Sequence, residues 1–425
     1  MLWDKHPSAL IAGAGPVGLF AALALTRRGI RVQIFDREIR TGAHSYALAL
    51  HPESLRLFEM HGLRDRILDE ACRVRSIVLH DEDGNRKTIS IRGIGADFPF
   101  VSVMRQDILE ELLEEALADT GVDVHWNHEV SMVEADDRRV VATIDRLDTE
   151  SRGYGVAHVE RVVTKSRETE VPFMVAADGL QSDLRTRLGI EFPEIAPPST
   201  FAVFEFKSGQ ELGDEMHVIL SQQRAAVCWP MPGGFCRWSF QIPDEHDRGF
   251  REKDRFAIER VEGDHPELED EALARLLKER APWFKGEIKE IAWRKRVRFE
   301  HRLASSFGEG RVWLLGDAAH TTGPVGVQSM NVGFREANGL ADALADVLLS
   351  GREREQLEAF GRAARDEWKV LLAVDNVPES SDGAASWIAR HRRQLLESIP
   401  ASGENLRELL ERAGLSVSRS TPVSR

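Results

Sequence analysis

The sequence predicts an α/β protein that contains an inserted, mostly antiparallel β-sheet and ends in C-terminal helices. Three observations support this prediction. Apolar strand-like runs that stop at a turn and continue into helical periodicity occur within residues 9–36, 171–190 and 311–351. Residues 200–300 contain several short strand-like runs, and residues 352–415 have helical periodicity.

Residues 9–36 form the unit around which the rest of the chain is organised. The apolar run Ala9–Ala12 meets a glycine-rich turn at residues 13–18 (GAGPVG), and a helical run follows to Arg28. A second apolar run then ends at Asp36. This order of strand, tight turn, helix and strand predicts a Rossmann-like, dinucleotide-binding unit.

Each residue type in this unit has a physical reason to be there. Gly13 permits the tight turn, Gly15 lets the backbone approach a pyrophosphate, and Gly18 lets the helix pack on the strand. Pro16 suits a first helical turn, where its missing N–H is no loss. Asp36 can accept hydrogen bonds from a ribose 2′-OH, and the helix N-terminus offers unpaired N–H groups to an anion.

The bulk composition is that of a globular protein with more than one domain. The chain has 425 residues, of which 42% are hydrophobic and 30% are charged. Its net charge of −14 disfavours nucleic acid or an anionic membrane as a partner. Cys72, Cys228 and Cys236 are too few and too scattered for a disulfide framework or a zinc site, so we expect a cytoplasmic protein without a metal. No residue from Pro7 to Thr26 is charged, but the glycines and proline within this run favour the α/β unit over a membrane span.

The chain between the first and second stretches mixes helices and strands. We expect a short amphipathic helix within residues 51–63, a hairpin around residues 83–85 and a helix that begins at Met104 and ends before Gly121. Further strands follow over residues 122–144. Residues 148–170 are charged, and we expect them to be an irregular excursion on the surface.

The second stretch ends a buried strand on an acidic turn. The apolar run Phe173–Ala177 stops at Asp178-Gly179, and a helix opens behind it. A strand that ends on Asp-Gly before a helix has the geometry of a ligand-facing edge in an open α/β sheet. By itself, however, an Asp-Gly pair is more often the mark of a simple turn.

The block from residue 200 to residue 300 predicts a mostly antiparallel sheet of short strands. A hairpin turn is expected at Pro232-Gly233-Gly234, and a charged helix at residues 265–281 interrupts the strands. Arg294, Arg296 and Arg298 lie on one strand face, where they either bind an anionic substrate or form a solvated sheet edge, and the pattern favours the edge.

The third stretch repeats the pattern of strand, acidic turn and helix. The strand Val312–Leu315 runs into Gly316-Asp317, and residues 323–326 (GPVG) form a loop. The helix that follows ends at Gly351 and carries apolar side chains at helical spacing, namely Met330, Phe334, Ala337, Ala341, Leu344 and Leu348. Residues 351–415 add helices that pack across the back of the molecule or mediate self-association, and residues 416–425 form a tail.

These three stretches, in this order, resemble the FAD-dependent aromatic hydroxylases, which are single-component flavoprotein monooxygenases of the para-hydroxybenzoate hydroxylase type. Residues 13–18 are similar to their dinucleotide fingerprint, and residues 177–185 (ADGLQSDLR) to their Asp-Gly motif. Residues 316–320 (GDAAH), with Pro324, Gln328 and Asn331, are similar to their Gly-Asp motif. The resemblance extends from about residue 8 to residue 350.

The resemblance implies FAD as cofactor and a role for individual residues. Arg105 would hold the pyrophosphate or the ribityl chain, the backbone at Val130 the adenine, and Asp317 a ribityl hydroxyl. The N–H groups at residues 329–331 would face the flavin pyrimidine at a positive helix end. The complete predicted cofactor-binding set is Gly13, Gly15, Pro16, Val17, Gly18, Asp36, Arg105, Val130, Asp178, Gly179, Gly316, Asp317, Pro324, Gly326, Ser329, Met330 and Asn331.

This chain departs from the family pattern at two positions. Family members often carry an arginine where Tyr46-Ala47 stands here, and a glycine where Ser329 stands. The first departure removes a charge near the flavin pyrophosphate, and the second alters backbone freedom beside the flavin.

The resemblance also implies a reaction. NADH or NADPH would reduce FAD transiently, O₂ would add to form a flavin C4a-hydroperoxide, and an aromatic or polyketide-like substrate would be hydroxylated. No catalytic residue is assigned. The candidates for a base are His44, Tyr46, His51 and His217, and a structural role is favoured for each. The strands that carry Trp229 and Trp238 suit an aromatic ligand, although tryptophan is equally a core residue.

The resemblance divides the chain into domains. It implies an FAD-binding domain over residues 1–73, 103–190 and 300–350, and a substrate-binding β-sheet domain over residues 74–102 and 191–299. Three alternatives stay open at this point: a halogenase, reductase or oxidase on the same fold, a flavin-binding module without turnover, and an NAD-dependent dehydrogenase that uses only the first stretch. The flavoprotein interpretation requires Asp36 and Asp317 to lie along one connected site.

Overall fold

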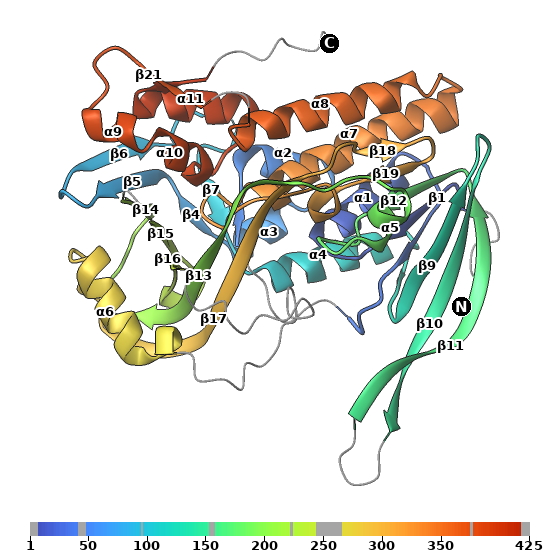
Figure 1. Cartoon of the computed structure of the whole chain (residues 1–425), viewed down its shortest axis with the longest axis horizontal. Coiled ribbons are helices and arrows are strands. Elements are labelled where there is room, and N and C mark those ends of the chain that lie inside the picture. Colours follow the sequence, from blue (N-terminus) through green and yellow to red (C-terminus); the bar gives the residue numbers. More distant parts are fainter. Residues whose placement is uncertain are drawn as a thin grey trace.

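The protein is seen here as a computed structural model that describes residues 7–40, 48–94, 97–152, 158–221, 224–243, 266–374 and 377–417. Two large sheets dominate it, and the C-terminal helices lie along one side of both (Figure 1). The structure confirms the predicted α/β class with an inserted, mostly antiparallel sheet.

The first sheet has six strands and contains the ends of all three sequence stretches. Its order is β18 (Gly308–Glu309), β19 (Val312–Leu314), β12 (Phe173–Ala176), β1 (Ala9–Ala12), β2 (Val32–Phe35) and β8 (Val124–His125). All neighbours are parallel except β18 and β19. The central strands are buried on both faces, which explains why they read as continuous apolar runs.

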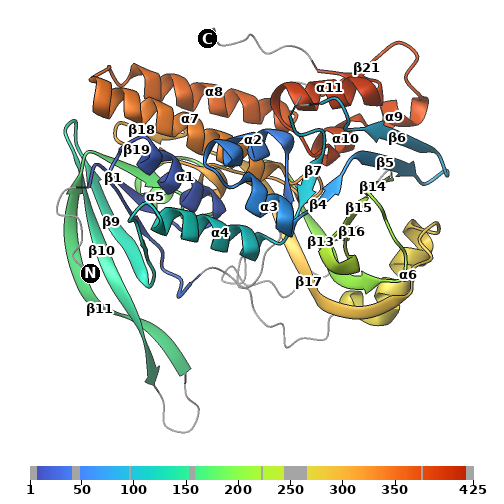
Figure 2. The same ribbon diagram turned by 180° about the vertical axis from the view of Figure 1, so that it is seen from behind.

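The two faces of this sheet are covered differently. One face, which includes Ala9 and Ile11, packs against α1 (Pro16–Arg27), α4 (Gln106–Ala118) and α7 (Gln328–Ser350). The other face packs against a three-stranded antiparallel sheet of β9 (His128–Ala135), β10 (Val140–Arg152) and β11 (His158–Val171). The hairpin of β10 and β11 extends well beyond the body of the molecule (Figures 1 and 2).

The second sheet has eight strands and only one parallel pair, β14 with β5. Its order is β20 (His320–Thr321), β17 (Ile288–Leu303), β13 (Glu194–Ser208), β16 (Phe235–Ile242), β15 (Ala225–Pro230), β14 (Glu215–Leu220), β5 (Ser76–Asp81) and β6 (Arg86–Ser90). One face of this sheet packs toward the loop that leads into α7, and helix α6 (Asp270–Arg280) covers the opposite face. The expected hairpin at residues 83–85 joins β5 to β6.

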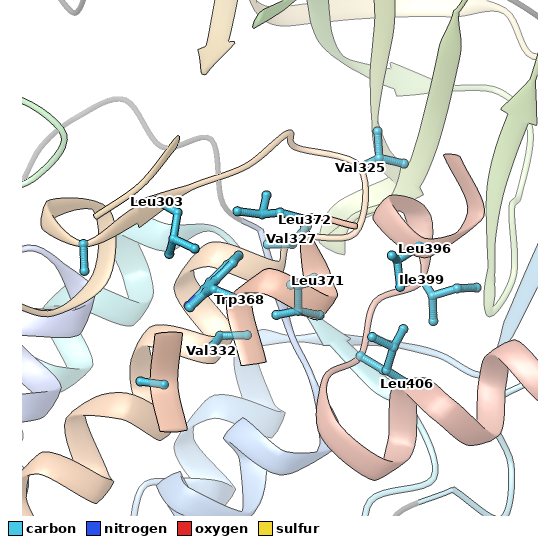
Figure 3. Close-up of a cluster of buried hydrophobic side chains, with 14 of the residues drawn as sticks. Leu303, Val325, Val327, Val332, Trp368, Leu371, Leu372, Leu396, Ile399 and Leu406 are labelled. Atoms are coloured by element: carbon cyan, nitrogen blue, oxygen red, sulfur yellow. The ribbon is translucent and has the colours of Figure 1, made fainter. Parts of the chain in front are cut away.

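The remaining elements connect these layers. They are β3 (Ala49–Leu50), α2 (Pro52–Met60), α3 (Arg64–Glu70), β4 (Cys72–Val74), β7 (Val101–Val103), α5 (Asp183–Arg187), α8 (Glu355–Leu371), β21 (Glu379–Ser380), α9 (Ser386–Arg390), α10 (Arg392–Ser398), α11 (Gly403–Ala413) and β22 (Leu415–Ser416). The C-terminal helices share one apolar core with the sheets, in which Trp368, Leu396 and Ile399 lie near Val327 and Val332 of the α7 region (Figure 3).

Three expectations about the chain were wrong or incomplete. Residues 148–170 are largely regular, because β10 and β11 pair along most of this segment, where side chains that are polar on both faces hid the strand periodicity. The strands of the second sheet are not all short, since β13 has 15 residues and β17 has 16. The arginine row is only partly a solvated edge: Arg294 is exposed, but the Arg296 side chain is 7% exposed and pairs with Glu267 at 3.5 Å.

Among the described residues, no helix is both long enough and apolar enough to cross a bilayer. The uncharged run that begins at Pro7 instead forms β1, the glycine-rich turn and the buried helix α1.

Candidate functional site

The carboxyl ends of four parallel strands stop level with one another. Phe35 pairs with Ala12, Ala12 with Ala176, and Ala176 with Leu314, so β2, β1, β12 and β19 end in one row. The segments that follow these residues therefore leave the sheet at the same edge, where ligands bind in open α/β sheets. Asp36 and Asp317 both lie at this edge, on strands roughly 14 Å apart at three strand spacings.

The glycine-rich turn packs directly on the Asp-Gly turn (Asp178-Gly179). Gly13 has φ +100°, and a Cβ placed on it would lie 2.1 Å from the Ala177 carbonyl oxygen. A Cβ on Gly18 would lie 2.1 Å from the Gly13 carbonyl oxygen. Both positions therefore need glycine, as the sequence pattern predicts, for close approach within this edge of the sheet.

The same turn also contacts the third stretch through Val17. A Cβ on Gly316 would lie 3.3 Å from the Val17 side chain, and one on Gly333 of α7 would lie 2.7 Å from it. The Arg185 guanidinium donates from Nη1 to the Ala318 carbonyl oxygen at 2.8 Å, which joins the Asp-Gly region to the Gly-Asp turn (Gly316-Asp317). Three stretches that are far apart in sequence thus form one contiguous structure.

The start of α1 has the features of an anion site. Gly15 is the N-cap residue, no side chain caps the helix, and Pro16 occupies the first turn. A Cβ on Gly15 would have no atom within 4 Å, so open space lies beside the backbone there. Uncapped N–H groups and the positive end of the helix dipole suit a phosphate group.

The Asp36 carboxylate lies beside this helix start. Oδ2 accepts from the Ala14 N–H at 2.6 Å, and Oδ1 accepts from the Glu38 N–H at 2.8 Å. Burial is the main cause of a raised pKa for Asp36, and these two N–H groups oppose it. Each oxygen keeps a further lone pair, so the carboxylate can still accept hydrogen bonds from ribose hydroxyls.

The Asp-Gly turn carries an unsatisfied acceptor. The Asp178 side chain accepts from the Leu184 N–H at Oδ2, at 3.3 Å, while its Oδ1 is buried without a hydrogen-bond partner. Burial raises the pKa of Asp178. A buried acceptor without a partner costs free energy and is a position that a ligand hydroxyl or amide would satisfy.

The start of α7 is a second uncapped and strained helix end. Val327, its N-cap, has φ +50° and ψ +42°, which is unusual for a β-branched residue, and no side chain caps the helix. The Ser329 Oγ is buried without a partner. Ser329 itself lies within α7, so the serine in place of glycine does not demand special backbone freedom. Met330, which follows it, is buried.

Asp317 and the loop 323–326 complete this end of the site. Asp317 is exposed, and desolvation by the surrounding protein raises its pKa, which His320 opposes and Glu336 reinforces. Gly326 is packed so tightly that a Cβ would lie 2.6 Å from the Glu397 carbonyl oxygen. Pro324, in the same loop, is half-buried.

Asn331 has a structural role that the motif alone did not indicate. Its Oδ1 accepts from the His51 N–H at 2.8 Å and from the Ser54 Oγ at 2.7 Å. Its Nδ2 donates to the carbonyl oxygens of Ala49 and Val327 at 2.9 and 2.7 Å. The side chain thus fastens the start of α7 to the β3–α2 segment.

Two other predicted residues lie at the margins of the edge. Arg105, the N-cap of α4, is about half exposed and pairs with Asp107, whose hydrogen bond is the main cause of a raised Arg105 pKa. Val130 lies in β9 and is buried. The chain enters β9 beside the end of β2, because the His128 N–H donates to the Asp36 carbonyl oxygen at 2.8 Å.

The histidine candidates for a base are buried. His51 Nε2 lies 2.9 Å from the Gly326 carbonyl oxygen, and burial lowers the pKa of His51 to about 3. His217 lies on the α6 side of the second sheet, 3.1 Å from a nitrogen of His80, and burial lowers its pKa to about 3. Both therefore support a structural role. His44 and Tyr46 lie outside the described residues.

The sheet face toward α7 carries a polar row that sequence reasoning missed. Trp229, Arg237, Glu205 and Trp293 are register partners across β15, β16, β13 and β17. Glu205 Oε2 accepts from Arg237 Nη2 at 2.5 Å and from Trp293 Nε1 at 3.0 Å, and both members of the ion pair are at most 3% exposed. The signal available in the sequence was that Glu205 and Arg237 are single charged residues at inward-facing positions of otherwise apolar strands.

Trp229 and Trp238, which were considered as contacts for an aromatic substrate, lie on opposite faces of the second sheet. Trp229 shares the core on the face toward α7, whereas Trp238 faces α6 and stacks on Phe240 with centroids 5.0 Å apart. Trp238 is therefore core packing on the far side of the sheet.

Comparison with known proteins places the site in context. Residues 7–372 match the family model described as FAD binding domain. The chain is 30% identical over 353 residues to 6-methylpretetramide 4-monooxygenase of Streptomyces rimosus, covering 83% of this chain and 58% of that protein. It is 26% identical over 386 residues to para-nitrophenol 4-monooxygenase of Pseudomonas sp. (strain WBC-3), covering 85% and 83%.

The fold has close counterparts among solved structures. The p-nitrophenol 4-monooxygenase of Pseudomonas putida DLL-E4 aligns with a TM-score of 0.71 at 20% identity, over 97% of this chain and 99% of that chain. The first six curated relatives are longer, and the chain spans between 58% and 65% of their length.

Proposed function

Since the chain belongs to the FAD-binding domain family, we propose that it is an FAD-dependent monooxygenase that hydroxylates an aromatic or polyketide-like substrate with NAD(P)H and O₂. The relatives named above act on a pretetramide and on a nitrophenol, which supports a substrate with a phenol-like ring.

The level row of strand ends is the observation that carries this proposal. An NAD-dependent dehydrogenase would need only the glycine-rich turn and Asp36, which the first βαβ unit supplies. Here a second and a third turn pack against the first through Ala177 and Val17. A longer cofactor that runs from Asp36 past the glycine-rich turn to Asp317 would contact all three turns.

The residues present fit FAD. We propose that Asp36 accepts from the adenosine ribose, that the uncapped start of α1 binds the pyrophosphate, and that Asp317 accepts from a ribityl hydroxyl. The uncapped start of α7 would place its N–H groups against the flavin pyrimidine and favour negative charge there. When bound, FAD would accept electrons from the nicotinamide and activate O₂ for transfer to the substrate.

We propose that the second sheet forms the substrate side of the site. Residues 74–102 and 191–299 would make up this domain, and residues 1–73, 103–190 and 300–350 the FAD-binding domain. The Glu205–Arg237 pair on the face toward α7 is buried, so it would fix the shape of this wall and the orientation of Trp293. Neither His51 nor His217 is proposed as a base, because burial lowers the pKa of each to about 3 and makes both weak proton acceptors.

The test begins with the purified protein and its bound cofactor. We expect a yellow protein that releases FAD on denaturation and oxidises NADH or NADPH faster when a suitable phenol or polycyclic phenol is added. With ¹⁸O₂, the product should gain one labelled oxygen atom. A colourless protein that cannot be loaded with FAD would refute the proposal, and substrate chlorination without oxygen insertion would replace it by a halogenase.

A further inference from the structure

We propose that helix α8 is a working part of the cofactor site, because Trp368, Glu336 and His320 form a buried network that positions the Gly-Asp turn. This inference rests on the proposed FAD-dependent function. Helix α8 itself contains none of the residues predicted to hold the cofactor, so the network would act on the site from behind.

One carboxylate joins three elements. Glu336 of α7 accepts from Trp368 Nε1 of α8 at 2.7 Å with Oε1, and its Oε2 lies 2.8 Å from His320 Nε2 of β20. His320 and Trp368 are fully buried, and Glu336 is 5% exposed. A buried carboxylate whose two oxygens each hold one donor is a fixed connection, because breaking either bond leaves a polar atom without a partner.

The surroundings also set the orientation of the imidazole. The His320 ring stacks on the Trp368 indole with centroids 3.9 Å apart, and Phe307 stacks near it at 6.0 Å. Its Nδ1 is buried without a hydrogen-bond partner. A proton on Nε2 meets Glu336, whereas a proton on Nδ1 would meet no acceptor, so we place a proton on Nε2, which donates to Glu336.

The network lies directly behind the turn that carries Asp317. His320 follows Asp317 by three residues, and its strand β20 pairs with Leu303 of β17. Among the groups that shift the Asp317 pKa, after the dominant effect of desolvation by the surrounding protein, are His320 and Glu336. Glu336 also stands three residues after Gly333, which packs with Gly316 against Val17. A displacement of Glu336 would therefore be transmitted both to Asp317 and to the glycine-rich turn.

Helix α8 is well placed to hold this network. Figure 3 shows Trp368 among Leu303, Val332 and Leu371, which come from β17, α7 and α8. The indole thus supplies both the stacking surface for His320 and the second donor to Glu336. Without that donor, one carboxylate oxygen of Glu336 would be buried and unpaired.

The experiment compares two variants and their combination with a matched control. Trp368→Phe removes the N–H donor and keeps a ring for stacking, and Glu336→Gln replaces the carboxylate with an amide of the same shape. Trp387→Phe is the control, because Trp387 of α9 is 7% exposed and belongs to the same apolar core as Trp368 but has no contact with Glu336 or His320 among the interactions of the described residues.

The measured quantities are the FAD dissociation constant, from flavin fluorescence, and the visible absorption spectrum of the bound flavin. We expect each network variant to raise the FAD dissociation constant by about tenfold or more. The dissociation constant of the double variant should lie within about threefold of that of the single variant with the lower FAD affinity, and that of Trp387→Phe within about twofold of wild type. Thermal unfolding of the apoproteins shows whether each variant folds.

Two results would overturn the inference while leaving the proposed function intact: network variants that bind FAD as the control does, or single effects that add up fully in the double variant. A wild-type protein that binds no FAD would overturn the proposed function as well. If Trp368→Phe fails to fold, the FAD affinity of Glu336→Gln decides the inference, because this change keeps volume and packing: affinity equal to that of the control overturns it, and a loss of about tenfold or more supports it.

Discussion

Replacing Gly15 by alanine separates the stability of the fold from the binding of the cofactor. Gly15 has φ −69° and ψ 177°, which alanine adopts readily, and a Cβ there would have no atom within 4 Å. Alanine lowers the entropy of the unfolded chain, which stabilises by about 0.4–1 kcal/mol, but it is a poorer N-cap residue than glycine by a similar amount. We therefore expect the free energy of unfolding of the apoprotein to change by less than about 1 kcal/mol, which for this size of chain is roughly 1 °C in Tm.

Binding of FAD should respond very differently. The open space beside Gly15 is where the pyrophosphate would approach the start of α1, so a methyl group there would push the phosphate away from the uncapped N–H groups. Loss of one hydrogen bond to a charged group costs about 1.5–3 kcal/mol, which corresponds to about a 10- to 150-fold weaker FAD complex.

The assay measures FAD affinity by fluorescence titration and apoprotein stability by thermal unfolding, side by side. Gly339→Ala is the control: it lies in α7, its Cβ would lie 3.5 Å from the Phe360 ring, and alanine there should stabilise the helix by about 0.5–1 kcal/mol without changing FAD affinity. Wild-type FAD affinity in Gly15→Ala would refute the assignment of the anion site. A loss of several kcal/mol in the apoprotein would refute the local geometry.

Three further predictions follow from the packing and from the pKa shifts. In Gly326→Ala the new methyl would lie 2.6 Å from the Glu397 carbonyl oxygen, so we expect a loss of about 1–3 kcal/mol in unfolding free energy and faster hydrogen exchange in α10, and an unchanged exchange pattern would contradict the predicted displacement. Burial raises the pKa of Glu110 to about 7, so the folded state keeps a proton that the unfolded state has lost, and stability falls as pH rises above about 4.5. In urea unfolding, Glu110→Gln should therefore be more stable than wild type by up to about 3 kcal/mol at pH 8 and equally stable near pH 4. The control Glu111→Gln, at an exposed position, should show no such difference. Burial lowers the pKa of His51 to about 3, so the unfolded state takes up the proton first, and stability is lost as pH falls below about 6.5. Between pH 7 and pH 5, His51→Gln should therefore lose about 2 kcal/mol less unfolding free energy than wild type. If the unfolding free energy of both proteins has the same pH dependence, His51 has an ordinary pKa and the prediction is wrong.

The accuracy of the sequence prediction depended on how local each feature was. The glycine-rich turn, Pro16 at the start of α1 and Gly351 at the end of α7 all appear as predicted, because backbone conformation within a few residues decides them. The hairpin of β10 and β11 was missed. Residues 148–150 and 163–168 of this hairpin are exposed, so their mostly polar side chains carry no apolar alternation that could mark a strand.

For the site as well, the accuracy of the prediction depended on how local each feature was. Motif spacing identified Asp36, Asp178 and Asp317 as ends of strands, but the Glu205–Arg237 pair was not found, because each charge lies on a different apolar strand and only register brings them together. The His320–Glu336–Trp368 connection was equally invisible, since it joins β20, α7 and α8.

By itself the sequence determined the local pieces of this protein: which runs form strands, where tight turns need glycine, and where helices begin and end. Those choices depend on φ/ψ restrictions and on periodicity within about a dozen residues. The tertiary structure alone decided that Phe35, Ala12, Ala176 and Leu314 stand in one row, and that Val17 meets both Gly316 and Gly333. The physical reason is that contacts between residues far apart in the sequence gain free energy only when the sheets and helices pack together and bury their apolar faces.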